Sequence, residues 1–376
     1  MNGRLIFIVQ SWGDPHEMNR LKHYTAVFNN IDIYAFTRNN VIYDFGLQFN
    51  NLGNLKNRNY LSRVFIYLKA VFLLCKLNIK NNVFYIQGSD NLFLYNVACI
   101  ITFRKPKFIY QISDIREILT TPNPINQLFS FIDALFTERA LLLVVTSEAF
   151  VEEYYKNKLR HFKVNYKLIE NKIHLYNQSL KNIYPLKKIE TPSDVITIGY
   201  FGILRCERSI KILLGLARTN RKFVIIIRGI LSPGLKNYAH EFDKVGNIYF
   251  PGEFISPIHL KEMYNEIDLA WICYPYGESG LGNMNWARTN RFYEAGYFNT
   301  PMITQEGTKD SFRAKEYNIG ITIDLGDIET CVQELSKLNI NEIEKLKNNF
   351  ENINEKTFII TNDYDDVDNF LKKVMD

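Results

Sequence analysis

Three polar side chains at the start of an expected helix have the types and spacing needed to bind a phosphorylated sugar. Asn290 and Arg291 open an apolar-periodic run, and Glu294 follows one helical turn later. A helix N-terminus presents unpaired N–H groups and a partial positive charge, which suit a phosphate. A carboxylate one turn further along can accept hydrogen bonds from sugar hydroxyls. The stretch therefore predicts a site for an anionic sugar derivative; the alternative is an ordinary amphipathic helix with a surface glutamate.

Buried strands are expected on both sides of this helix. Residues 267–274 form a continuous apolar run of strand length, and another short apolar run begins at Pro301. A glycine-bearing loop separates the first run from the helix. The order strand, loop, helix and strand predicts a βαβ-type unit, which brings the loop and the helix start to one edge of a sheet.

The run NRFYEAGYFNTPMIT, which begins at Asn290, resembles the donor-site signature of the GT-B glycosyltransferases. The resemblance is strongest to the large retaining family that includes bacterial lipopolysaccharide and capsule transferases. In that family the glutamate at the place of Glu294 binds the ribose of the nucleotide sugar. The resemblance implies an α/β fold of two Rossmann-like domains, with parallel sheets facing across a cleft and a C-terminal helix crossing back to the first domain.

Two α/β domains are also expected from the chain itself. Strand-like and helix-like runs alternate over residues 1–180 and again over 195–358, and a polar stretch with Pro185 and Pro192 separates them. Such alternation predicts mostly parallel sheets covered on both faces, with ligands bound beyond the carboxyl ends of the strands. We expect an acceptor-side first domain, a nucleotide-sugar-binding second domain, and a final helix within 360–376 that packs on the first domain.

A basic segment opens the second domain. The run GILRCERS, which starts at Gly202, resembles the family segment G-R-L-x-x-E-K-G, whose basic residues hold the donor diphosphate. Arg208 takes the lysine position, while Ile203 stands where arginine is usual and Arg205 is expected to substitute for it. A fixed guanidinium can stabilise the charge of a departing diphosphate without a metal. The alternative is that both arginines pair with Glu207 or with other carboxylates of the helix surface.

Two later segments of the second domain extend the resemblance. Arg228 and a following glycine end an apolar run, as in the strand-then-glycine segment of the same fold. The run NIYFPG, which ends at Gly252, resembles N-V-x-F-x-G, and Gly252 lies where family members accept the nucleotide base. Both residues are therefore expected in the donor site.

Candidate acceptor contacts follow the first strand of the first domain. The loop after residues 4–10 contains Gly13, Asp14, His16 and Glu17. The resembling transferases place an acceptor-facing loop here. Capping of the next helix by Asp14, together with solvent exposure, is the alternative.

Two carboxylates are the candidates for contact with the reacting sugar. Asp114 lies in FIYQISDIREIL, which resembles the strand-end segment V-x-D-x-W-P-E, although it also has the position of a helix cap. The retaining family has paired glutamates, but Trp286 stands at the first position of the pair, and the nearest upstream carboxylate is Glu278 in the glycine loop. Glu278 or Asn283 is expected to take that role. Retention of configuration is expected, no residue is named as general base, and no D-x-D motif indicates a metal.

Composition and charge narrow the function classes. The chain has 376 residues, 47% of them hydrophobic, a net charge of +5 and five scattered cysteines. This mild positive charge suits phosphorylated ligands or an anionic membrane surface, and the absence of a dense Lys/Arg stripe excludes nucleic acid. Scattered cysteines in apolar runs indicate buried free thiols of a cytosolic protein.

No apolar run is long enough to cross a membrane. The nearest candidate, residues 60–79, is interrupted by Arg63, Lys69 and Lys76. We expect this segment to be a helix packed on a sheet with its lysine stems at the rim. Contact with the membrane surface is the alternative.

The sequence therefore predicts a glycosyltransferase that moves a sugar from a nucleotide-diphosphate donor to a glycan or lipid-linked saccharide. The resemblance places it in surface polysaccharide synthesis, in the cytoplasm, with peripheral contact with the inner membrane. Apart from the donor, no cofactor or metal is expected. The alternatives are a sugar-nucleotide epimerase of GT-B fold and a non-catalytic sugar-binding subunit of a polysaccharide assembly complex.

Overall fold

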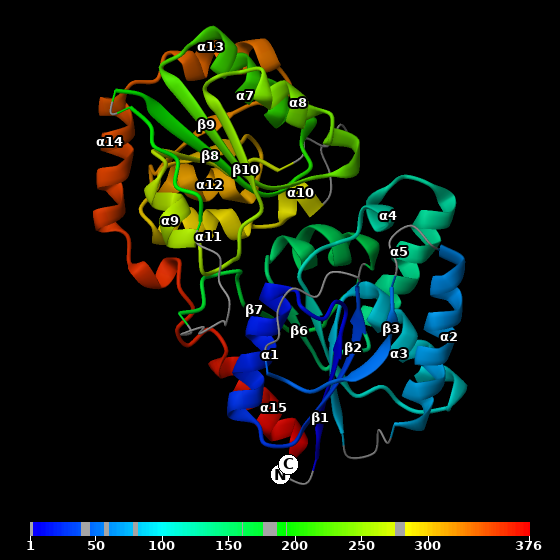
Figure 1. Cartoon of the computed structure of the whole chain (residues 1–376). Coiled ribbons are helices and arrows are strands. Elements are labelled where there is room, and N and C mark those ends of the chain that lie inside the picture. The colour runs from blue at the N-terminus through cyan, green and yellow to red at the C-terminus, as the bar shows by residue number, and fades with distance from the viewer. Residues whose placement is uncertain are drawn as a thin grey trace. The chain divides into compact units, whose positions relative to one another are not determined.

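The computed structural model describes residues 3–38, 46–55, 60–77, 82–159, 161–175, 186–192, 194–274 and 283–376 (Figure 1). The chain divides into two compact units. The first unit comprises Met1–Glu170 together with Thr361–Asp376, and the second comprises Asn171–Ile360. Much of the expected linker lies outside the described residues.

The first unit is built on a parallel sheet of seven strands in the order β3-β2-β1-β4-β5-β6-β7. The strands are β1 (Leu5–Val9), β2 (Ile31–Thr37), β3 (Asn50–Asn54), β4 (Val83–Gln87), β5 (Phe108–Ile112), β6 (Leu142–Val145) and β7 (Tyr166–Leu168). Every residue of β1, β4, β5 and β6 is buried. This burial pattern is that of a parallel sheet with helices on both faces.

The C-terminal helix belongs to the first unit. The helices here are α1 (Pro15–Val27), α2 (Tyr60–Lys76), α3 (Ser89–Ile101), α4 (Glu117–Thr120), α5 (Pro124–Thr137), the π-helix η1 (Phe150–Tyr155), α6 (Lys156–Lys158) and α15 (Asp365–Met375). His23 of α1 bonds with Asp368 of α15 over 2.9 Å and stacks on Tyr364. The predicted return of the last helix to the first domain is thus observed.

The second unit has a parallel sheet of six strands in the order β10-β9-β8-β11-β12-β13. The strands are β8 (Ile196–Leu204), β9 (Phe223–Leu231), β10 (Ile248–Gly252), β11 (Leu269–Trp271), β12 (Met302–Gln305) and β13 (Gly320–Ile323). The helices are α7 (Glu207–Thr219), α8 (Tyr238–Asp243), α9 (Leu260–Asn265), α10 (Asn283–Trp286), α11 (Asn290–Tyr297), α12 (Lys309–Glu316), α13 (Ile328–Ser336) and α14 (Ile340–Asn348), with short 3-10 turns η2 (Pro233–Leu235), η3 (Asn349–Asn352) and η4 (Glu355–Thr357).

Each face of the second sheet has its own hydrophobic core. One core joins β8 and β9 to α7 and α13, and the other joins the opposite side chains of the sheet to α9, α11 and α12. Two Rossmann-like units with parallel sheets confirm the predicted fold class. Of the helices that the structure describes, none is long and apolar enough to span a bilayer.

Candidate functional site

The strand order of the second unit predicts where a ligand binds. β8 has neighbours β9 and β11, and the chain continues from β8 to β9 but from β11 to β12 on the other side. Ligands of open parallel sheets bind beyond the carboxyl ends of the strands at such a switch point. The predicted donor residue Gly202 lies near the end of β8. Asn290, Arg291 and Glu294 lie in α11, which stands between β11 and β12 in the chain.

Glycines leave three positions without side chains near the strand ends at this edge of the sheet. Gly202 in β8 lies in register with Gly229 in β9, and both have positive φ, 104° and 131°. A Cβ atom on Gly229 would lie 1.9 Å from the carbonyl oxygen of Gly202, so the backbones approach closely here. Gly252, with φ 94°, ends the adjoining strand β10 and has open space around it. The predicted residues Gly202 and Gly252 thus lie at the ends of two of three adjoining strands.

Arg291 lies at the start of α11, beside the end of β8. Its guanidinium carbon is 5.3 Å from the ring centre of Tyr200 and 5.8 Å from that of Tyr274. A Cβ atom on Gly202 would be 4.0 Å from Arg291 Nε. Its Nη1 atom is buried and has no hydrogen-bond partner among the described residues. A buried donor of this kind is costly unless something binds it, and a phosphate oxygen would satisfy it.

Glu294 lies one turn deeper in α11 and is buried, with 9% of its surface exposed. Its Oε2 atom accepts a hydrogen bond of 3.0 Å from the Tyr264 hydroxyl of α9. Burial raises the pKa of Glu294, while the Tyr264 hydrogen bond and the charge of Arg291 act to lower it. The carboxyl group is therefore held in one orientation and can accept further hydrogen bonds.

Asp310 is a site residue that sequence analysis missed. Its two carboxylate oxygens accept hydrogen bonds of 3.3 and 3.2 Å from the backbone N–H of Thr289, the N-cap residue of α11. Burial raises the pKa of Asp310 to about 7, although the hydrogen bonds from Thr289 and the nearby arginines oppose this shift. Asp310 thus ties the start of α11 to the first turn of α12.

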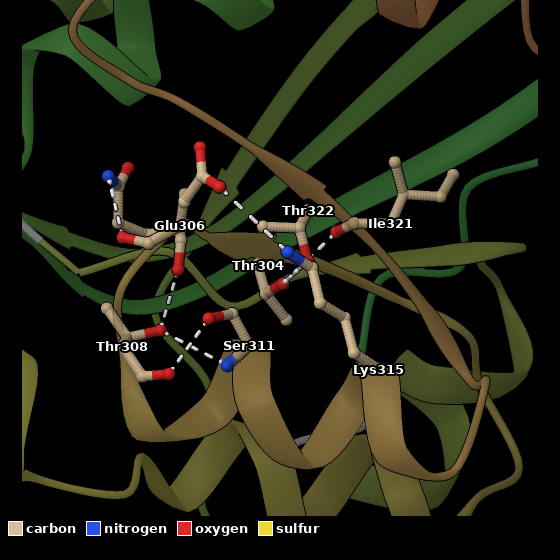
Figure 2. Close-up of polar contacts among 8 residues, drawn as sticks. Thr304, Glu306, Thr308, Ser311, Lys315, Ile321 and Thr322 are labelled. Carbon is tan, nitrogen blue, oxygen red and sulfur yellow. Dashed lines mark hydrogen bonds and ion pairs between the residues drawn. The ribbon is translucent and has the colours of Figure 1, made fainter.

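Hydrogen bonds link the end of β12 to the first turn of α12, the turn to which Asp310 belongs (Figure 2 shows Thr308 and Ser311 of this network). Thr308 Oγ1 caps α12 by accepting from Ser311 N over 3.2 Å, and it donates to Gln305 O over 2.7 Å. Ser311 Oγ donates back to Thr308 O over 2.8 Å. Thr304 of β12 also donates to Ile321 O of β13 over 3.1 Å. The first three bonds fix the first turn of α12 at the end of β12, and the last one joins β12 to β13.

The structure separates the two arginines of the GILRCERS segment. Arg205 is exposed, whereas Arg208 is partly buried and its Nη1 atom donates to the backbone oxygens of Leu325 and Gly326, over 3.3 and 3.0 Å. Glu207 bonds instead with Lys211 and Tyr238, over 3.2 and 2.8 Å.

Arg228 has a different environment from the one we expected. Only 1% of it is exposed, and Nη2 bonds with Glu266 Oε2 over 2.7 Å and Lys187 O over 2.8 Å. A buried cation already paired with a carboxylate is poorly suited to bind a phosphate. Arg228 is thus paired inside the second unit, and its donor role stays a prediction.

The structure describes Asn290, the remaining predicted residue of α11, but not the loop carboxylate Glu278. Asn290 is the first residue of α11 and is partly buried beside the Thr289 cap. Glu278 lies outside the described residues, as does most of the loop between β11 and α10.

The acceptor candidates of the first unit follow the carboxyl end of β1. Gly13 has a positive φ of 92°, Asp14 is exposed, and Asp14 Oδ1 accepts from Glu17 N over 3.3 Å. His16 lies in the first turn of α1, and its side chain is outside the described part of the chain. Glu17 Oε2 accepts from Ser11 N over 3.1 Å, and burial, with Asp14 nearby, raises the pKa of Glu17 to about 8.

Asp114 follows the carboxyl end of β5 and is exposed. Arg116 is the N-cap residue of the short helix α4, two residues after Asp114. Both β1 and β5 end at the same edge of the first sheet, because all its strands are parallel. The acceptor candidates and Asp114 therefore share one edge.

Comparisons with known proteins agree with this description. No known family profile matches the chain. The chain is 24% identical over 354 residues to the succinoglycan biosynthesis protein ExoL of Rhizobium meliloti, covering 90% of this chain and 85% of ExoL. The Anabaena protein Alr3699/HepE, solved with UDP and glucose, superposes with a TM-score of 0.64 at 13% identity, over 98% of this chain and 100% of that one.

A second solved structure supports the same fold. The sucrose-phosphate synthase of Thermosynechococcus elongatus superposes with a TM-score of 0.68 at 13% identity, over 99% of this chain and 98% of that one. The predicted resemblance to GT-B glycosyltransferases is thereby confirmed. The comparisons favour neither the epimerase nor the non-catalytic subunit.

Proposed function

We infer that this chain, which has the GT-B fold, is a glycosyltransferase that moves a sugar from a nucleotide-diphosphate donor to an acceptor in surface polysaccharide synthesis. The observation that carries this inference is the environment of Arg291. Its guanidinium lies beside Gly202 at the switch point of the second sheet, with a buried Nη1 donor that no described residue satisfies. A donor diphosphate is the ligand that fits this position best.

The donor is held by the second unit. In this proposal Arg291 and the start of α11 bind the diphosphate, and Glu294 accepts from the ribose hydroxyls. Arg205 and Arg208 supply further positive charge at the start of α7, and the bare end of β10 at Gly252 leaves room for the base. UDP is the first nucleotide to test, because HepE was solved with it.

Transfer breaks the bond between the anomeric carbon and the diphosphate, and the electron pair leaves with the diphosphate. An acceptor hydroxyl oxygen forms the new glycosidic bond, and its proton passes to an oxygen of the departing diphosphate. Arg291 stabilises the negative charge of the leaving group, so the proposed reaction proceeds without a metal. We propose retention of configuration, with Asp114 and Glu278 as the carboxylates that meet the reacting sugars.

The acceptor meets the first unit. We propose a glycan or lipid-linked saccharide that contacts Gly13, Asp14 and His16 after β1. The relative ExoL is named for succinoglycan biosynthesis, which supports a polysaccharide acceptor. Growth of such a polymer on a lipid carrier would bring the enzyme to the cytoplasmic face of the membrane.

Calorimetric titration with UDP, first with a chelator and then with magnesium, tests the donor site. We expect UDP to bind without magnesium and Arg291→Ala to weaken binding by roughly 10- to 100-fold, because a charge-assisted hydrogen bond contributes about 1.5–3 kcal/mol. Arg218→Ala is the matched control, since Arg218 pairs with Glu241 near the end of α7. Unchanged affinity in Arg291→Ala would overturn the assigned site.

A further inference from the structure

The outer surface of three helices in the first unit is apolar. α2 packs against α3, and α3 against α5, along one side of the unit (Figure 1). Exposed hydrophobic side chains extend over all three helices, and we call this surface the apolar face. Its members are Val64, Phe65, Leu68 and Phe72 of α2, Phe93, Ile100 and Ile101 of α3, and Ile125, Leu128, Phe129, Phe131 and Leu135 of α5.

The apolar face is continuous on α2. Val64, Leu68 and Phe72 are spaced four residues apart and so form one stripe, and they are 54%, 62% and 60% exposed. The opposite side of the helix, with Ala70 and Leu74, is buried in the unit. A surface helix normally presents polar residues outward. α2 is apolar on both sides, which indicates that the outer stripe contacts something other than this chain.

Phe103 projects from the end of α3 into solvent. Its side chain is 97% exposed, and its backbone has a φ of 51°, which is uncommon for a residue other than glycine. Glycine is the usual residue at this position after a helix. Exposed Arg104 and Lys105 follow it directly. The Phe103 ring is almost fully exposed, so burial of this ring does not stabilise the folded chain. We therefore infer that the ring contacts something outside the chain.

Positive charges surround the apolar face. α2 contains Arg63, Lys69 and Lys76 and no acidic residue, and Arg104, Lys105 and Lys107 follow α3. The one acid of α3, Asp90, is paired with Arg116 over 2.5 Å and accepts from Tyr67 over 2.9 Å. The one acid of α5, Asp133, is buried. Two exposed acids, Glu117 of α4 and Glu138 after α5, lie next to these helices in the chain and are fewer than the cations. The surface that faces outward therefore combines hydrocarbon with an excess of positive charge.

A cavity of about 300 Å³ opens within this surface. Its wall is mainly apolar and includes Phe93, Ile118, Leu119, Phe129, Ile132 and Phe136. Phe93 and Phe129 also belong to the apolar face, so the cavity and the face are continuous. This volume is at the lower end of the range for ligand pockets.

We propose that the apolar face docks on an anionic lipid bilayer, with Phe103 inserted at the boundary of head groups and acyl chains. Bilayer surfaces accept an apolar stripe and surrounding lysines and arginines together. A second copy of this chain would bring the same cations against one another and is disfavoured by like-charge repulsion. The proposal deepens the membrane contact within the proposed function, and it needs no donor to be bound.

Sedimentation of the full chain with lipid vesicles tests the proposal. We expect binding to vesicles of equal parts phosphatidylglycerol and phosphatidylcholine, and much weaker binding to phosphatidylcholine alone. Lys69→Glu with Lys76→Glu should weaken binding at least tenfold, because each basic residue near an anionic surface contributes about fivefold. Lys345→Glu with Lys347→Glu, exposed on α14, is the matched control and should bind as the wild type does.

The hydrophobic contribution has its own variant and control. Phe65→Ser with Phe72→Ser and Phe103→Ser should weaken vesicle binding at least tenfold, and Phe312→Ser, which is 58% exposed on α12, should not. Circular dichroism and UDP affinity measured on the same samples separate this result from misfolding and from failure of the donor site. Equal binding by all variants, or binding to neutral vesicles as tight as to anionic ones, would refute the docking surface.

A fluorescent reporter tests insertion directly. Phe103→Trp should give a blue-shifted emission that bromine-labelled acyl chains quench, whereas the natural Trp12, Trp271 and Trp286 are buried and should not respond. Absence of quenching would overturn the assigned role of Phe103. A lipid-free dimer in analytical ultracentrifugation that the three phenylalanine substitutions disperse would assign the face to a second copy instead.

Discussion

The carboxyl edges of the two sheets are built differently. In the second unit, Arg291, Glu294 and Asp310 are wholly or partly buried, and hydrogen bonds from Tyr264 and Thr289 hold the two carboxyl groups. In the first unit, Asp14 and Asp114 are exposed on turns. A preorganised edge suits the diphosphate, because fixed dipoles need not reorganise as charge develops. An exposed edge suits an acceptor, since binding residues often lie on surface loops that a rigid sheet positions.

Glu17 is the exception in the first unit. Its carboxyl group accepts from Ser11 N, and burial raises its pKa to about 8. Asp310, with a pKa of about 7, is its counterpart in the second unit. Glu17 and Asp310 therefore give each sheet edge a carboxyl group whose pKa is raised to a stated value, and substitutions of these two residues can be compared.

The largest effect is expected from Gly229→Ala. The new Cβ would meet the carbonyl oxygen of Gly202, and the backbone has a φ of 131°. Strain and close packing together should lower the free energy of unfolding of the second unit by roughly 3–5 kcal/mol. Urea unfolding followed by fluorine NMR of the fluorotryptophan-labelled chain measures this, because Trp271 and Trp286 report on the second unit and Trp12 on the first.

Gly246→Ala is the control for that substitution. No atom lies within 4 Å of its Cβ position, so its stability should change by at most about 1 kcal/mol. Equal effects of the two alanines would show that the close backbone approach at the second edge contributes nothing to stability.

Asp310→Asn should change how the second unit responds to pH. The folded-state pKa of about 7 is above the usual value of 3.8, so between these values the folded state keeps a proton that the unfolded state has lost. Stability from this group is therefore present at low pH and falls as pH rises. The wild type should lose roughly 2–3 kcal/mol from this group between pH 5 and pH 8, and the amide variant should lack that loss.

The measurement for Asp310→Asn is urea unfolding at the two pH values, read from the tryptophan signals of the second unit. Asp243→Asn, on the exposed side of α8, is the control. If wild type and Asp310→Asn show parallel pH profiles, the carboxyl group does not titrate as its burial implies.

Glu17→Gln is the corresponding change in the first unit and should have a smaller effect. Its pKa is also raised, from 4.5 to about 8, so its stabilising contribution is again lost as pH rises through that window. Glu17 is partly exposed, and solvent screening reduces the expected loss to roughly 1–2 kcal/mol. The Trp12 signal reports the unfolding of the first unit. A larger pH-dependent loss of unfolding free energy from Glu17 than from Asp310 would contradict the expected difference between the two edges.

The sequence predicted the sheets because their central strands are continuous apolar runs. The same signal failed for β3, whose sequence NNLGN is polar and lies at the sheet edge, and for β7, which is only three residues long. Edge strands have little buried surface, so their hydrophobic pattern is weak.

Part of the donor site was predictable because its members are neighbours in the chain. Gly202 follows a strand-like run, and Arg291 and Glu294 share one helix, so local spacing indicated them. Asp310 and Tyr264 were missed, because each joins the site through a hydrogen bond to another element. The pairing of Arg228 with Glu266 was missed for the same reason, since nothing in its own segment indicated that partner.

The smallest effect on stability, and the sharpest on activity, is expected from Asp114→Asn. The side chain is exposed, so the free energy of unfolding should change by no more than about 0.5 kcal/mol. UDP affinity should also be unchanged, because the proposed donor site lies in the second unit, while sugar transfer to an acceptor should fall at least tenfold if the carboxylate meets the reacting sugar. Asp363→Asn, elsewhere in the first unit, is the control. Unchanged transfer with unchanged UDP affinity would remove Asp114 from the reaction and leave the exposed edge of the first unit without a chemical role.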